Sequence, residues 1–175
     1  MGDRCSCSID ITGIMSAQNA PLLAQALVDA YVEGYGHQAK SDKVLKAVLS
    51  GESHFDFDEV NYAQMPDSLS QACDDLNLSY VWHNDSGDEY GQGDVYMDSR
   101  TGKAASYNLV DGNICLTLDQ FEQEGVFEEA KKWEAFARER GFFIYASNHE
   151  LLAAEAAGKL PEGYINLLGD INIAA

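Results

Sequence analysis

The stretch between residues 78 and 118 most constrains the fold, because strand-like apolar runs alternate there with turn signals. The dipeptide at 111–112, Asp-Gly, is a strong hairpin signal, since both residue types tolerate the positive φ of a two-residue turn. Strands joined by such short connections run antiparallel. The stretch therefore predicts an antiparallel meander, with strands near Leu78–His83, Asp94–Met97, Ala105–Val110 and Ile114–Leu118.

Before the meander, the chain changes between the two-residue period of strands and the 3.6-residue period of helices. Asn19 is a favourable N-cap, and Pro66 suits the entry to a helix. Alternation of phenylalanine with carboxylates at 55–60 predicts an edge strand with a charged outer face. The predicted elements are a strand at Ser6–Thr12, a helix from Asn19 to Gly34, a helix at Ser41–Ser50, a strand at Phe55–Val60 and a helix at Asp67–Leu76.

After the meander comes an amphipathic helix that Gly141 ends. Its apolar stripe consists of Val126, Phe127, Ala130, Trp133, Phe136 and Ala137. A short strand at Phe142–Ala146 and a helix from Asn148 to about Gly158 follow, and Gly163–Ala174 holds two further apolar runs.

This order of elements predicts an α+β fold, with an antiparallel meander sheet packed against several amphipathic helices. The chain has 175 residues, of which 46% are hydrophobic, enough for one compact domain over 1–175 with its own core. A helix that runs into a strand ending in Asn occurs twice, at 66–84 and 126–148, as a weak sign of a helix–strand duplication.

Charge is distributed very unevenly along the chain. The sequence has 29 Asp and Glu against 11 Lys and Arg, for a formal net charge of −18. Between Lys46 and Arg100 there is no lysine or arginine, although many of the carboxylates lie there. Proteins bind nucleic acids and anionic membranes through cations, so direct binding to either is not expected.

Cysteine usage, metal motifs and targeting signals point to a cytoplasmic protein without a cofactor. The N-terminus lacks a secretory pattern, and the four cysteines (Cys5, Cys7, Cys73 and Cys115) are expected to be free thiols, with Cys73 a small buried hydrophobe. Cys5-x-Cys7 with a histidine lacks the paired knuckles of structural zinc. The acidic loop Asn84–Asp94 fails the EF-hand register, because its glycines fall in the wrong places.

Catalytic motifs are weak in this sequence. The carboxylates at 56 and 58, and those at 85, 88 and 89, occur near Trp82, Tyr90 and Tyr96 in the sequence, an arrangement known from glycosidases. Acid–base catalysis requires a raised pKa, which spacing alone cannot show. Neither a nucleophile elbow nor a Walker loop occurs, and a dinucleotide fingerprint is incomplete. The sequence therefore predicts a protein without enzymatic activity.

The cation-free stretch is the main functional signal. A folded surface that carries carboxylates without cations offers the basic cleft of a nucleic-acid-binding protein a competing partner. By composition the chain looks like the small acidic inhibitors with which phages and mobile elements block restriction and CRISPR machinery, an analogy of charge that no family motif carries. Two alternatives are an adaptor with a merely solubilising acidic surface and a carboxylate-dependent hydrolase. The predicted partner-binding residues are Asp56, Asp58, Glu59, Asp74, Asp75, Asp85, Asp88, Glu89 and Asp94.

Overall fold

The computed structural model describes residues 5–33, 41–60, 65–86, 91–99, 102–110, 113–139, 158 and 162–167, without the side chains of 32–33, 58–60, 103 and 134–139. Its strands are β1 Cys5–Thr12, β2 Ile14–Ser16, β3 His54–Val60, β4 Ser79–Asn84, β5 Gly93–Asp98, β6 Lys103–Val110, β7 Asn113–Cys115 and β8 Tyr164–Asn166. Its helices are α1 Ala20–Glu33, α2 Ser41–Leu49, α3 Asp67–Asp75, α4 Leu118–Glu122 and α5 Val126–Glu139.

Six strands form one antiparallel sheet in the order β3-β1-β4-β5-β6-β7. The last four strands of this order, from β4 to β7, form the predicted meander. β1 lies between β3 and β4, so the first strand of the chain is central in the sheet, and β3 is an edge strand as its alternation predicts. The α+β class with an antiparallel sheet and flanking helices is confirmed.

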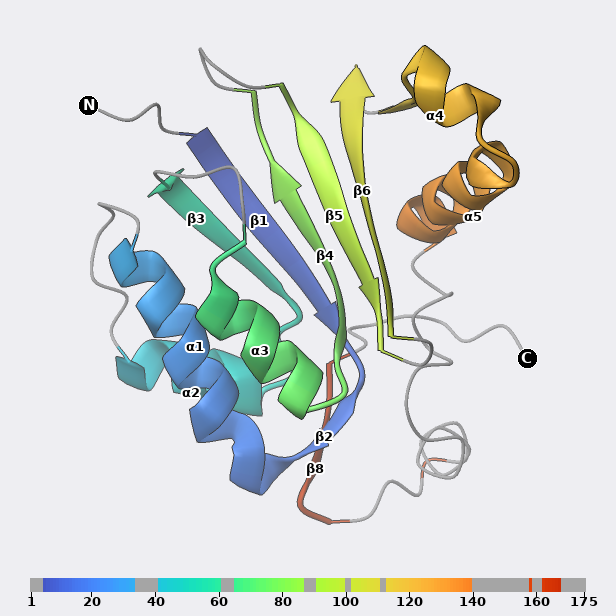
Figure 1. The fold of residues 1–175 in the computed structure, drawn as a ribbon. Helices are drawn as coiled ribbons and strands as arrows, with labels where there is room; N and C mark the ends of the chain where they lie inside the picture. Colours follow the sequence, from blue (N-terminus) through green and yellow to red (C-terminus); the bar gives the residue numbers. More distant parts are fainter. Residues whose placement is uncertain are drawn as a thin grey trace.

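The main core lies between one face of the sheet and helices α1, α2 and α3, which gather on that face (Figure 1). Alternation along each strand supplies the sheet side of this core, for example Ile9 and Ile11 from β1 and Phe57 from β3. Leu69 and Cys73 of α3 are fully buried in it, as their helical spacing predicts. Burial also raises the pKa of the Cys73 thiol, as expected for an inert core cysteine.

A smaller second core lies on the opposite face of the sheet, over β5 and β6. Tyr96 and Tyr107 pack there against Ala130 and Trp133 of α5, and the rings of Tyr96 and Trp133 stack with centroids 5.2 Å apart. Helices α4 and α5 stand beside β6, apart from the three helices of the main core (Figure 1). β5 therefore packs on both faces, whereas alternate residues of β6 remain exposed on the face turned away from the second core.

A two-stranded antiparallel sheet of β2 and β8 contributes the buried side chains of Met15 and Ile165 to the main core. Met15 pairs with Ile165, and two further backbone hydrogen bonds extend the contact, from Ala17 N to Gly163 O and from Leu167 N to Gly13 O. Strands of three residues have no measurable periodicity, and neither strand is predicted from the sequence.

One helix start and one strand end differ from the prediction. Ala17–Asn19 forms a 3-10 turn capped by Ser16, so α1 begins at Ala20 and Asn19 is not its N-cap. The last meander strand ends at Cys115, because Thr117 and Gln120 form a capping box that begins α4. The predicted strand at Phe142–Ala146 and helix from Asn148 lie outside the described residues, as does the end of the second supposed repeat. In the part of the chain that is described, no helix has the length and apolarity to cross a membrane.

Candidate binding surface

Polar side chains cross the sheet in two rows on the face opposite α1–α3. Strand register places Asp56, Ser8, His83, Asp94 and Tyr107 in one row across β3, β1, β4, β5 and β6. The neighbouring row consists of His54, Asp10, Val81, Tyr96 and Ala105. Directly opposed residues of adjacent strands have side chains close enough to interact. The register therefore brings two histidines next to carboxylates from three strands.

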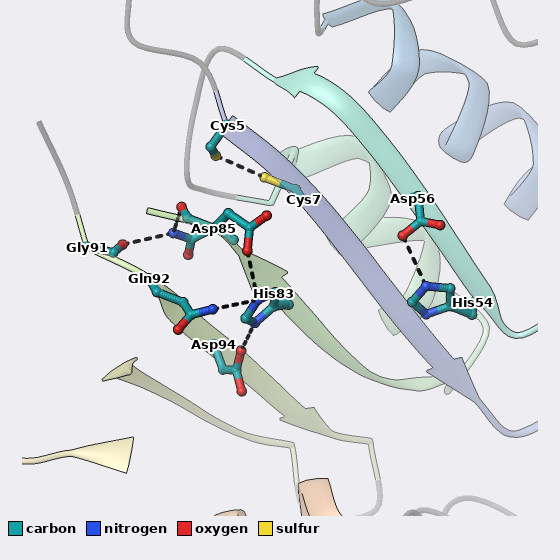
Figure 2. A network of polar contacts seen from close by, with 10 residues as sticks. Cys5, Cys7, His54, Asp56, His83, Asp85, Gly91, Gln92 and Asp94 are labelled. Atoms are coloured by element: carbon teal, nitrogen blue, oxygen red, sulfur yellow. Dashed lines mark hydrogen bonds and ion pairs between the residues drawn. The ribbon is translucent and has the colours of Figure 1, made fainter. Parts of the chain in front are cut away.

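His54 lies between two aspartates. Its Nδ1 is 3.0 Å from Oδ1 of Asp10 on the neighbouring strand. Its Nε2 is 3.1 Å from Oδ1 of Asp56 on its own strand, the contact that Figure 2 shows. Partial burial lowers the pKa of His54, but the hydrogen bonds and charges of the two aspartates together outweigh burial and raise it. The side chain of Asp56 is 76% exposed, so this pair faces solvent.

His83 lies in a similar arrangement further into the sheet. Its Nδ1 is 2.5 Å from Oδ1 of Asp94, and its Nε2 is 3.5 Å from Oδ1 of Asp85 and 3.3 Å from Nε2 of Gln92 (Figure 2). The hydrogen bond to Asp94 is the largest influence on the pKa of His83 and raises it; partial burial opposes this effect, and the charges of both aspartates add to it. We call Asp10, His54, Asp56, His83, Asp85 and Asp94 the His–Asp surface.

Asp94 differs from the other predicted partner-binding residues because it is buried, with only 8% of its surface exposed. Its Oδ1 faces His83, and its Oδ2 accepts a hydrogen bond of 2.6 Å from the Tyr96 hydroxyl. The second core covers this face of β5 and removes Asp94 from solvent. Asp94 therefore orients His83 and cannot itself contact a partner in this conformation.

Asp74 and Asp75 form a separate acidic group at the end of α3. Both are exposed, as predicted, and burial together with the charge of Asp75 raises the pKa of Asp74. Because α3 covers the other face of the sheet, this pair lies on the opposite side from Asp56 and Asp85. Asp74 and Asp75 therefore do not share one face with Asp56 and Asp85, since a helix and an alternating strand that share a core present their polar sides in opposite directions.

The remaining predicted residues cannot be placed at the level of side chains. Asp58 and Glu59 belong to β3, but their side chains lie outside the described part, and Asp88 and Glu89 lie in the undescribed residues 87–90. Lys131 of α5 pairs with Glu128 of its own helix at 3.2 Å and lies 4.2 Å from the centre of the Phe127 ring.

The cysteines of β1 form a close thiol pair. The two Sγ atoms of Cys5 and Cys7 are 3.4 Å apart, and both residues are buried (Figure 2). Burial, and then the hydrogen bond to Cys5, raise the pKa of Cys7, which disfavours the reactive thiolate. Within the described ranges, no cluster of three or more His, Cys, Asp or Glu side chains has the geometry of a metal site.

His54 and His83 are the functional candidates that the sequence analysis did not identify; it named the carboxylates but not the histidines that contact them. A signal was present, since the pattern His-x-Asp occurs at 54–56 and again at 83–85. Residues two apart on a strand share a face, so each pattern places an imidazole beside a carboxylate. Asp10 had no such signal, because its contact with His54 depends on the pairing of β1 with β3.

Replacing Asp94 with Asn should lower the pKa of His83, because the substitution removes the charge behind the largest upward influence while it keeps the size of the side chain. The measurement is a pH titration of the imidazole resonances by NMR. The same change at Asp75, on the other side of the sheet, should leave His83 as in the wild type. An unchanged His83 titration in Asp94→Asn would show that this contact does not hold the imidazolium.

Comparison with known proteins adds no relative: no protein-family model, no curated protein and no solved structure matches the chain.

Proposed function

We propose that the protein is a non-enzymatic acidic binding protein that occupies the basic surface of a nucleic-acid-binding protein in the cytoplasm, in the manner of phage- and mobile-element-type inhibitors of restriction or CRISPR systems. The partner would bind through lysines and arginines that otherwise hold phosphates. The protein would thus compete with nucleic acid for the partner without touching nucleic acid itself.

One observation carries this proposal: three exposed carboxylates of the cation-free stretch, Asp56, Asp75 and Asp85, have histidine or amide partners in place of lysine or arginine. Asp56 and Asp85 face histidines, and Asp75 accepts a hydrogen bond of 2.8 Å from Gln71. A neutral imidazole or an amide leaves the charge of the carboxylate uncompensated. These carboxylates are therefore available to cations of a partner.

The physical reason is charge complementarity. Basic clefts gain affinity for DNA because cationic side chains neutralise phosphates and release counterions. Carboxylates fixed on a folded sheet offer the same cations a partner whose geometry is already set, and association between opposite charges is fast and sensitive to salt. A merely solubilising surface would have no such partner.

The test is capture of proteins from a host lysate at low and high salt, followed by displacement with duplex DNA. We expect the captured proteins to include nucleic-acid-binding proteins, to be released as salt rises from about 0.05 M to about 0.5 M, and to be displaced by duplex DNA. Partners that remain bound at high salt would favour an adaptor with an apolar contact. Capture that DNA does not compete with would contradict the proposal.

A further inference from the structure

We infer that the His–Asp surface is where the basic partner docks, and that its two histidines let protons compete with that partner. The inference rests on the proposed function and adds two statements to it: the face of the molecule that binds, and a dependence of binding on pH.

Each histidine contacts one exposed carboxylate that a partner would need, Asp56 for His54 and Asp85 for His83. Both ring nitrogens of His54 face aspartate oxygens, and so do both ring nitrogens of His83. An imidazolium donates from both nitrogens, whereas a neutral imidazole donates from one. A protonated histidine therefore holds its exposed aspartate, Asp56 or Asp85, in the place that a lysine or arginine of the partner would take.

Protonation also changes the charge of this surface. It carries the carboxylates of Asp10, Asp56, Asp85 and Asp94 and two imidazoles, so two protons halve its formal negative charge. The aspartates raise the pKa of each histidine, which places the change in the range above the ordinary imidazole value of about 6.5. At lower pH the surface is partly neutralised, and at higher pH the exposed carboxylates of Asp56 and Asp85 no longer face an imidazolium and can bind a cation of the partner.

Groups on the surrounding strands do not offset this change. The described side chains that face the two rings are Asp10 from β1, Asp56 from β3, Asp85 after β4, Asp94 from β5 and the uncharged Ser8, Val81 and Gln92. Beyond Asp94 lie the phenol of Tyr96 and that of Tyr107, whose pKa is raised by burial and then by Glu129 on α5. Phenols ordinarily titrate near pH 10, so the histidines are the groups among these that change charge near neutrality.

The surface fits a basic protein for reasons of exposure as well as charge. Asp56 and Asp85 have side chains 76% and 56% exposed, while the second core keeps Asp94 inside to hold His83. Carboxylates on adjacent strands are held at the strand spacing of about 4.8 Å and its multiples. Lysine and arginine side chains can reach such oxygens directly, and arginine can bind one carboxylate through two donors.

The experiment measures binding of a labelled oligolysine peptide at constant ionic strength between about pH 5.5 and about pH 8.5, a range in which lysine stays charged and histidine does not. We expect the wild type to bind about five- to tenfold more tightly at the upper end. The double variant His54→Gln/His83→Gln should bind at all pH values with nearly the affinity that the wild type has at high pH. The matched variant His37→Gln/His149→Gln, which removes the other two histidines of the chain, should keep the wild-type dependence.

A second measurement does not depend on whether a variant folds. Because coupling between two ligands is reciprocal, saturating oligolysine should lower the pKa of His54 and His83 in the wild type, as followed by NMR. Unshifted histidines, or affinity that does not change with pH, would overturn the inference and leave the proposed function standing. Absence of oligolysine binding at every pH would overturn both.

Discussion

Replacing Trp82 with Ala should destabilise the protein by about 3–5 kcal/mol, the range measured for removing a buried aromatic side chain. Trp82 is fully buried on β4, and its ring packs against that of Phe57 with centroids 5.3 Å apart. Phe57 in turn contacts Tyr31 of α1 at 4.5 Å, so the indole belongs to a chain of rings that joins the sheet to a helix. A domain of this size has a total stability of about 5–15 kcal/mol, so the variant should lose a large fraction of it.

Denaturation followed by far-UV circular dichroism is the appropriate measurement, because the substitution removes one of only two tryptophans and would alter fluorescence by itself. Leu118→Ala is the matched control. Leu118 is a large apolar residue that is 81% exposed on α4, and its truncation should change stability by less than about 0.5 kcal/mol. Equal effects of the two substitutions would contradict the position of Trp82 in the main core.

Replacing Gly51 with Ala should produce the second large effect. Gly51 follows α2 with a φ of +84°, a conformation that costs a residue with a Cβ about 1–2 kcal/mol. An added Cβ would also lie 2.7 Å from the backbone oxygen of Asn166, the last residue of β8. Neither atom belongs to a flexible side chain, so the backbone must shift and the loss should exceed the conformational cost alone.

Gly102→Ala separates these two contributions. Gly102 has a similar φ of +64°, and no atom lies within 4 Å of the position that a Cβ would occupy. This variant should lose only the conformational part, and the difference between the two variants measures the contact with β8. Amide hydrogen exchange in β2 and β8 should quicken in Gly51→Ala and not in Gly102→Ala; the same exchange rates in both would show that Gly51 does not support this strand pair.

Local patterns in the sequence predict most of the sheet and its helices, because each of these elements buries one face. The alternation in Phe55–Val60 places Phe57 inward and Asp56 outward, and the spacing of Leu69 and Cys73 gives the buried side of α3. Such patterns depend only on residues that are neighbours along the chain. They therefore remain readable without knowledge of the tertiary structure.

The candidate site was less predictable, because it depends on which strands pair and on what covers them. Alternation places Asp94 and Tyr96 on the outer face of β5 and therefore predicts that both side chains are exposed to solvent. Packing of α5 against that face buries both residues and turns a surface carboxylate into the hydrogen-bond partner of His83. The pairing of His54 with Asp10 likewise joins residues from distant parts of the sequence.

The pairing of Met15 with Ile165 joins two strands that the ribosome synthesises far apart in time. A ribosome adds about 5–20 residues per second, so β8 follows β2 after an interval on the order of ten seconds. The last strand of the six-stranded sheet, β7, is synthesised within that interval, so the sheet can be complete while the backbone groups of β2 have yet to meet β8. The nascent protein thus carries an open strand edge, the kind of surface that chaperones bind and that promotes association between chains.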